Sequence, residues 1–171
     1  NLQRFFAMNR MQLRMLPHDT AKAQREAYEA GRCDALSSDQ SQLYAIRQAL
    51  KDPAAHEILP EIIAKEPLGP AVRKGDAQWA DIVRWTLFAL IEAEDQGISS
   101  VNVDQARRQA SNPVIQGFLG SLDAEGSPLA ADTGSAMGLD AQWAYRIIRQ
   151  VGNYGEVFER NLGSLGIKRG L

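Results

Sequence analysis

The sequence predicts an α/β protein, and three observations point to that class. Residues 11–16 alternate apolar and polar side chains, residues 33–36 form a short apolar run, and helix signals lie between and after the two segments. This strand–helix–strand–helix order is typical of right-handed βαβ units with a parallel sheet. With 171 residues, of which 44% are hydrophobic, the chain is long enough for one or two small domains with a core.

The first part of the chain alternates between helix and strand signals. Residues 2–8 are typical of the end of a helix, and the period of two over 11–16 predicts a strand. Asp19 or Thr20 is the predicted N-cap of the next helix, because short polar side chains satisfy the first N–H groups of a helix. Gly31 follows where a left-handed residue is favoured, so this helix is predicted to end just before it.

The second predicted strand, residues 33–36, leads into another helix. The strand is short and apolar enough to be buried, and Ser-Ser-Asp at 37–39 then opens a helix that Asp52 and Pro53 stop. Over 56–73 three prolines exclude a long helix and a central strand, because proline lacks the N–H group that both need. That stretch is an edge strand or a connection, either between two lobes or over the surface. The helix that begins at 37–39 carries Leu43, Ile46 and Leu50 on its apolar face.

The second half of the chain changes to helix signals alone. Asp76 is the predicted cap of a long helix that Gly97 ends. Trp85 and Phe88 widen its apolar stripe beyond that of a half-exposed helix, so we expect another part of the protein to cover it. The other apolar residues of this helix are Trp79, Ile82, Val83, Leu87, Leu90 and Ile91.

Shorter elements follow the long helix. Short helices are predicted near 103–110 and 113–119, and the Gly-, Ser-, Ala- and Asp-rich stretch 120–138 predicts a surface loop. Asp140 is the predicted cap of a helix that Gly152 ends. The last predicted helix carries Tyr154, Val157, Phe158 and Leu162.

The composition excludes several classes of protein. A net charge of −2 argues against a basic face for nucleic acid, and no apolar run approaches the roughly 18 residues that span a membrane. Cys33 is the only cysteine, and with two histidines, His18 and His56, far apart in the sequence, the chain lacks a zinc-ligand set. Cys33 is therefore a small buried hydrophobe, a thiolate without a placed base, or half of a disulfide whose partner lies outside this chain.

The candidate binding residues lie where the second predicted strand ends. Asp39 follows that strand, and the crevice past the carboxyl end of a strand is where α/β proteins bind small ligands. Aspartate is also a favoured helix N-cap, and Ser38 beside it is either a ligand contact or a capping hydroxyl. Asp34 is predicted to bond a neighbouring loop. Arg73 and Lys74 precede a capped helix and are predicted to be solvated charges.

Three motifs, in order, resemble one family. The first is Gly-Arg-Cys-Asp-Ala at 31–35 followed by Asp39, and the second is Leu-Gly-Pro-Ala-Val-Arg-Lys-Gly-Asp at 68–76, which leads into the Trp-rich helix. The third is Gln-Val-Gly-Asn-Tyr-Gly-Glu-Val-Phe-Glu-Arg-Asn at 150–161. Together they resemble the second half of a periplasmic amino-acid-binding protein of an ABC transporter (solute-binding protein family 3), and the third is most similar to the general L-amino-acid subgroup.

The resemblance implies a periplasmic-binding-protein-like (type II) fold with two α/β lobes. In that fold residues 1–60 are most of the second lobe, and 61–75 are the hinge and return crossing. Residues 76–171 are the helical segment that packs on the first lobe. The chain begins without Met or a secretory signal, so we expect it to be a partial chain that lacks the N-terminal lobe.

The resemblance also implies a function without chemistry: binding of polar L-amino acids in the periplasm and delivery to the permease of an ABC transporter, with no cofactor or metal. The family position that matches Asp39 holds the ligand's α-ammonium group, as expected for a fixed carboxylate in a crevice that excludes water. Ser38 is a weaker ligand contact. Cys33 matches a cysteine that forms a disulfide, here with a partner outside the chain.

Two alternatives share this scaffold: an enzyme of the cyclohexadienyl or arogenate dehydratase type, and the effector-binding domain of a transcription regulator. The dehydratase needs a general acid or base aimed into the cleft, and no carboxylate pair or histidine stands at a matching position. The uncovered apolar helix faces also predict self-association of the isolated chain.

Overall fold

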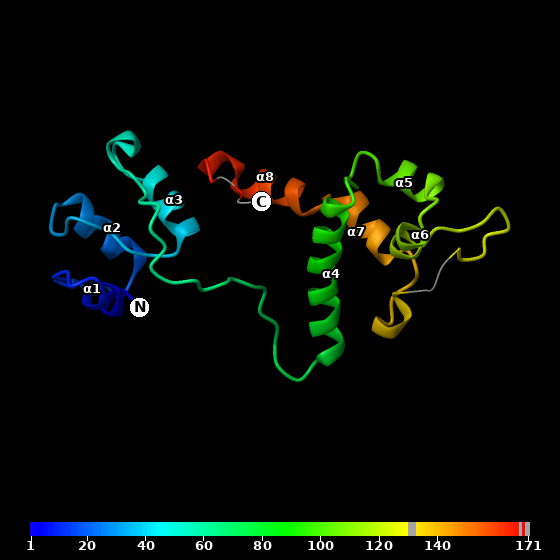
Figure 1. Cartoon of the computed structure of the whole chain (residues 1–171), viewed down its shortest axis with the longest axis horizontal. Coiled ribbons are helices and arrows are strands. Elements are labelled where there is room, and N and C mark those ends of the chain that lie inside the picture. Colours follow the sequence, from blue (N-terminus) through cyan, green and yellow to red (C-terminus); the bar gives the residue numbers. More distant parts are fainter. Residues whose placement is uncertain (130–132, 168, 170–171) are drawn as a thin grey trace. The chain divides into compact units, whose positions relative to one another are not determined.

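The computed structural model describes residues 1–129, 133–167 and 169, and it divides into two compact units (Figure 1). Unit 1 comprises Asn1–Leu68 together with Leu165–Leu171, and unit 2 comprises Gly69–Ser164. Each unit is described by itself.

The described residues of unit 1 form three short α-helices, and each confirms a predicted helix. Thr20, not Asp19, caps the second of them: its Oγ1 accepts a hydrogen bond from the backbone N–H of Ala23 at 3.2 Å. Gly31 follows with a φ of +67°, a conformation that glycine adopts without strain. The bounds are α1 Leu2–Met8, α2 Ala21–Glu29 and α3 Gln40–Gln48, followed by the 3-10 helix η1 Pro53–Ala55.

The two predicted strands of unit 1 do not form, which corrects the sheet expected from the sequence. Residues 11–16 and 33–36 are irregular, and within the described residues they pair neither with each other nor with another segment. Residues 56–73 form no strand either. A strand is held by hydrogen bonds to a neighbouring strand, and without one a short segment gains nothing from extending. In the part of the chain described, one isolated bridge pairs Leu122 with Pro128.

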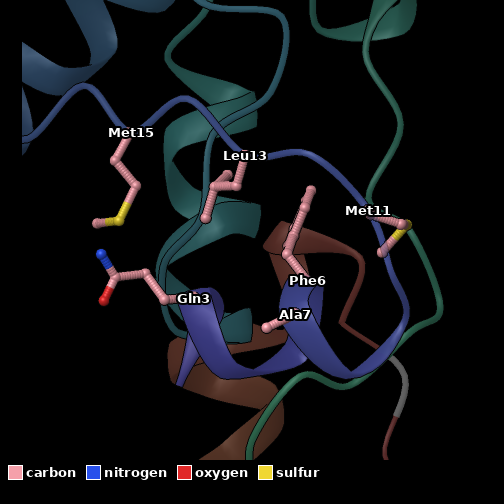
Figure 2. A pocket seen from close by; sticks show the side chains of 6 residues that line it. All are labelled: Gln3, Phe6, Ala7, Met11, Leu13 and Met15. Atoms are coloured by element: carbon pink, nitrogen blue, oxygen red, sulfur yellow. The ribbon is translucent and has the colours of Figure 1, made fainter.

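The segment 11–16 nevertheless keeps the alternation of side chains that predicted a strand. Leu13 and Met15 point toward α1, and Phe6 of α1 points back toward the segment (Figure 2). These side chains border a cavity of about 280 Å³. Met11 and Met15 remain 45% and 47% exposed, so this apolar side is open to solvent.

Unit 2 is a body of helices that pack on one another, and all five predicted helices form. Helix α4 packs against α7 and α8, and α7 also packs against α5 and α6. The bounds are α4 Ala77–Asp95, α5 Val103–Gln109, α6 Pro113–Leu119, α7 Trp143–Val151 and α8 Tyr154–Leu162, with the 3-10 helix η2 Ser135–Met137. The 3-10 helix η3 Gly163–Leu165 follows α8, and its last residue is assigned to unit 1.

The helix caps of unit 2 follow the sequence closely, with one correction. Asp76 caps α4, and its Oδ1 accepts a hydrogen bond from the N–H of Trp79 at 2.9 Å. Asp140 does not cap α7, whose N-cap is Gln142. Instead, Asp140 accepts the N–H of Gln142 at 2.9 Å and pairs with Arg146 at 2.9 Å, so it fixes the turn before the helix.

The core of unit 2 consists of two clusters that α4 and α7 connect. Ala93 of α4 and Ile148 of α7 belong to one cluster, and Ala89 of α4 and Ala144 of α7 belong to the other. The small residues of α4 leave space beside the helix, and large side chains from α5, α6 and α7 fill it. The further members are Ile98, Val103 and Leu119 in the first cluster, and Met137 and Trp143 in the second.

The stretch 120–138 is not simply the predicted surface loop. Gly120, Ser121 and Met137 are buried, and the Ser121 hydroxyl donates a hydrogen bond to the Arg107 carbonyl at 2.9 Å. Both ends of the stretch therefore belong to the core. Residues 130–132 lie outside the described residues.

The apolar stripe of α4 is wider than the neighbouring helices cover, as the sequence predicted. Ala89 and Ala93 are buried, whereas Trp85, Phe88 and Ile91 are 49%, 47% and 39% exposed. The Trp85 and Phe88 rings contact each other edge to face at 5.7 Å. No described part of unit 2 covers this side of the helix.

Candidate functional site

Asp39 occupies the N-cap position of α3 without capping it through its side chain. Its backbone has a φ of −57° and a ψ of 142°, and its carbonyl oxygen accepts the N–H of Leu43 at 2.9 Å. The carboxylate makes no capping hydrogen bond and is exposed. Two roles were predicted for this side chain, a helix cap and a ligand contact. The capping hydrogen bond is not made, and the carboxylate remains accessible to a cation. The described residues of unit 1 do not themselves exclude water from it.

The two residues before Asp39 are held from both neighbouring helices. The side-chain amide of Gln24, on α2, donates a hydrogen bond to the Ser37 carbonyl oxygen at 3.0 Å. The Ser38 hydroxyl donates to Oε1 of Gln42, on the first turn of α3. The entry into α3 is therefore tied to α2 on one side and to α3 itself on the other.

Ser38 has a different role from the capping hydroxyl considered in the sequence. The Ser38 hydroxyl donates its proton to the side chain of Gln42. A capping hydroxyl would instead accept a hydrogen bond from a backbone N–H. The Ser38 oxygen keeps lone pairs that can accept a further hydrogen bond. A contact between Ser38 and a ligand stays a prediction.

The other residues singled out in the sequence do not form a common site with Asp39 among the described contacts. The Cys33 thiol is free and half-buried. Asp34 is exposed, and its predicted bond to a loop is not found among the described residues. Arg73 and Lys74 are exposed in the segment before α4, in keeping with solvated charges.

Unit 1 also holds a polar pocket of about 550 Å³ beside the last turn of α3, which the sequence did not indicate. His56 lines it, and Nδ1 of His56 lies 2.8 Å from the Tyr28 hydroxyl oxygen. Arg47 also lines it, and its Nε donates to the Pro53 carbonyl at 2.9 Å. These bonds join α2, α3 and η1, so they account for the local structure. Asp39 does not line this pocket.

The carboxyl groups of Glu156 and Asp104, in unit 2, have lowered pKa values, and hydrogen bonds account for both. Burial raises the pKa of Glu156, but hydrogen bonds from Ser100 and Asn153 and the charge of Arg160 outweigh it, so the net pKa is lowered. A hydrogen bond from the Tyr145 hydroxyl, at 2.7 Å, is the main cause of the lowered pKa of Asp104. Both carboxylates join one helical segment to another, which is a structural role.

Metal binding and membrane insertion find no support in the described residues. No group of three or more His, Cys, Asp or Glu residues among them could hold a metal ion. None of the described helices combines the length and hydropathy that crossing a membrane requires.

The chain is similar, over 99–100% of its length, to proteins whose names refer to amino-acid binding or to an amino-acid ABC transporter. YhdW of Escherichia coli K12, whose name refers to an amino-acid ABC transporter, is 50% identical over 99% of this chain and 48% of its own length. The general L-amino acid-binding periplasmic protein AapJ of Rhizobium johnstonii is 49% identical over 100% of this chain and 49% of its own. The glutamate/glutamine/aspartate/asparagine-binding protein BztA of Rhodobacter capsulatus is 44% identical, again over 100% and 49%. No family model matches the chain.

The fold of the chain is also similar to that of a solved periplasmic binding protein. The periplasmic binding protein of an ABC transporter from Brucella ovis, with glutathione bound, is 46% identical with a TM-score of 0.86, over 99% of this chain and 52% of that one. The chain therefore spans about half the length of the proteins it matches. Over that span, it is similar to periplasmic amino-acid-binding proteins of ABC transporters.

Proposed function

We propose that this chain is the C-terminal portion of a two-lobed (type II) protein that binds polar L-amino acids in the periplasm and delivers them to an ABC transporter permease. Identity of 44–50% over the whole chain to amino-acid-binding proteins carries this proposal. In it, residues 1–60 are most of the second lobe, 61–75 are the return crossing, and 76–171 pack on the first lobe.

We infer that Asp39 binds the α-ammonium group of the ligand. Its carboxylate is exposed and makes no capping hydrogen bond, so both oxygens can accept N–H bonds from a cation. A charge-assisted bond of this kind is about twice as strong as a neutral one. The hydroxyl oxygen of Ser38, the residue just before Asp39, supplies a further acceptor. The groups that hold the ligand carboxylate and select its side chain belong to the part of the full-length protein outside this chain.

The ligands named for the relatives share one chemical group. Amino acids carry a free α-ammonium and α-carboxylate on one carbon, and glutathione carries the same group on its γ-glutamyl end. A site that recognises this head group accepts both, and the rest of the pocket decides which side chains fit. This common feature supports a site in which Asp39 recognises the head group.

Capture and release follow from a shift between open and closed arrangements of the two lobes. A ligand that contacts both lobes binds the closed form more tightly, so it shifts the population toward that form. No bond is made or broken, and the mechanism needs no cofactor or catalytic residue. In the full-length protein, Cys33 forms a disulfide with a cysteine outside this chain, as the oxidising periplasm permits.

Isothermal titration of the full-length protein with L-glutamate tests the proposal. Asp39→Asn keeps the shape of the side chain and removes its charge, so the Kd is expected to rise about 30-fold or more, as for a truncated charge pair. Asp34→Asn, five residues earlier, makes the same change in net charge and leaves the Kd unchanged. Wild-type affinity in Asp39→Asn removes Asp39 from the site, and absence of amino-acid binding in the wild type overturns the function.

A further inference from the structure

We propose that Gln24 is a positioning residue for Asp39: through its bond to the Ser37 carbonyl, it fixes where the carboxylate of Asp39 meets the ligand. The inference rests on the proposed function, because it concerns the same site. Gln24 lies on α2, fifteen residues before Asp39, and does not need to touch the ligand to act.

The position of Asp39 depends on its backbone, because its side chain is not tied down by a cap. The side-chain amide of Gln24 donates to the Ser37 carbonyl at 3.0 Å. The Ser38 hydroxyl donates to Gln42. Together these bonds fix the two residues that lead into Asp39, whose own φ of −57° and ψ of 142° are not helical. A change in the path of residues 37 and 38 therefore moves the carboxylate directly.

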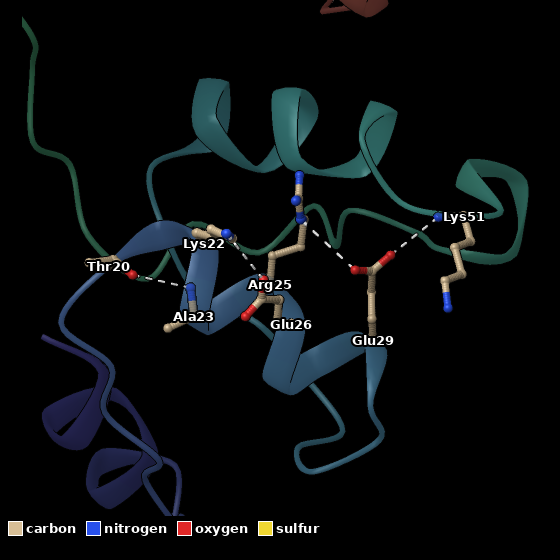
Figure 3. Close-up of polar contacts among 7 residues, drawn as sticks. All are labelled: Thr20, Lys22, Ala23, Arg25, Glu26, Glu29 and Lys51. Atoms are coloured by element: carbon tan, nitrogen blue, oxygen red, sulfur yellow. Dashed lines mark hydrogen bonds and ion pairs between the residues drawn. The ribbon is translucent and has the colours of Figure 1, made fainter.

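Helix α2 is a suitable anchor because it is itself held to both ends of α3. Ala27 of α2 is 0% exposed. On the far side, Glu29 accepts the backbone N–H of Lys51, just after α3, at 3.3 Å, and pairs with Arg25 at 3.9 Å (Figure 3). Gln24 makes the corresponding connection to the segment before α3. Helix α2 thus holds the entry and the exit of the helix that carries the site.

The chemistry of glutamine suits this position. Its amide donates to a carbonyl without adding a charge, so the attraction between Asp39 and a cation is undisturbed. Binding groups must be held within about 0.5 Å of the productive geometry for full affinity. A neutral donor that holds the backbone beside the carboxylate meets that requirement through one hydrogen bond.

The test is a double-mutant cycle in the full-length protein, titrated with L-glutamate. Gln24→Met keeps the length of the side chain and removes the donor, and the Kd is expected to rise about 3- to 10-fold. In the Asp39→Asn background, the same substitution is expected to change the Kd less than 2-fold, because the charge it positions is gone. Gln48→Met, an exposed glutamine on α3, is the control and leaves the Kd unchanged.

A second measurement keeps the test decisive where the double variant binds too weakly. In the ligand-free protein, hydrogen exchange at the amides of residues 38–43 is expected to be faster in Gln24→Met than in Gln48→Met. Equal loss of affinity in both backgrounds, or unchanged affinity and exchange in Gln24→Met, overturns the positioning role. If Asp39→Asn alone binds like the wild type, the proposed site fails instead.

Discussion

The two units of this protein differ in how they bury apolar surface. Unit 2 contains both core clusters, in which Val103, Leu119 and Ile148 are 0% exposed. In unit 1, Ala27 and Leu50 are the only buried hydrophobic residues among those described. The candidate site at Asp39 therefore stands on the unit with the smaller core, and the well-packed unit carries none of the predicted ligand contacts.

This difference follows from how the two kinds of element find partners. Each helix of unit 2 makes its own backbone hydrogen bonds and needs only a neighbour for its apolar side. A strand needs a second strand even for its backbone. Residues 11–16 and 33–36 find no such partner among the described residues and remain unpaired.

The largest effect is expected in the core of unit 2. Leu119→Ala removes a side chain that is 0% exposed and leaves a cavity, so it is expected to lower the free energy of unfolding by about 2–5 kcal/mol. Leu129→Ala, the same change at a residue that is 45% exposed, is expected to cost less than about 0.5 kcal/mol. Urea unfolding followed by circular dichroism measures both. Equal losses would contradict the core assignment.

A smaller effect is expected from the carboxylate of Glu156, which joins α8 to the connection between α4 and α5. Glu156 accepts hydrogen bonds from the N–H of Ser100 at 3.0 Å and of Asn153 at 2.8 Å. Its folded pKa is lowered, so the stability it contributes is present above its ordinary value of 4.5 and is lost as the pH falls through the folded pKa. Glu156→Gln is expected to cost about 1–2 kcal/mol at pH 7.

Urea unfolding of the Glu156→Gln variant as a function of pH checks this sign. The gap between the variant and the wild type should narrow as the pH falls below 4.5, because the wild type then loses its charged hydrogen bonds. A gap that stays constant from pH 7 to the acid range would show that the charge of Glu156 contributes nothing.

The smallest effect is expected at the start of α2 in unit 1. Thr20 caps this helix, and the exposed pair Lys22–Glu26 lies one turn further at 3.9 Å (Figure 3). Thr20→Ala is expected to destabilise the helix by about 1 kcal/mol, which raises the exchange rates of its amides about five-fold. Lys22→Ala is expected to change them less than two-fold, because exposed ion pairs contribute little. The reverse order would mean that charge, not the cap, holds the helix.

Local signals predicted the helices well. Capping residues such as Thr20 and Asp76, and glycines such as Gly31 placed after a helix, act within one turn of the chain. The cap of α7 was misplaced by two residues, because Asp140 bonds the turn just before the helix instead. Strands were not predictable in this way, because whether residues 11–16 pair depends on residues far away in the sequence.

The candidate site was predictable only in part. Asp39 was singled out because it follows an apolar run and lies in a motif that resembles a known family, and its contact with a ligand stays a prediction. Gln24 could not, because a bond from a side chain to a backbone carbonyl thirteen residues away leaves no pattern in the sequence. The stretch 120–138 shows the opposite error: its small polar residues predicted a surface loop, yet Met137 reaches the core.

Hydrogen exchange of the full-length protein, with and without L-glutamate, tests most directly whether the ligand is held at the start of α3. We expect the ligand to slow exchange at residues 37–43 at least ten-fold, while the amides of α7, around the buried Ile148, change less than two-fold. Slowing at α7 with no change at 37–43 would contradict this expectation.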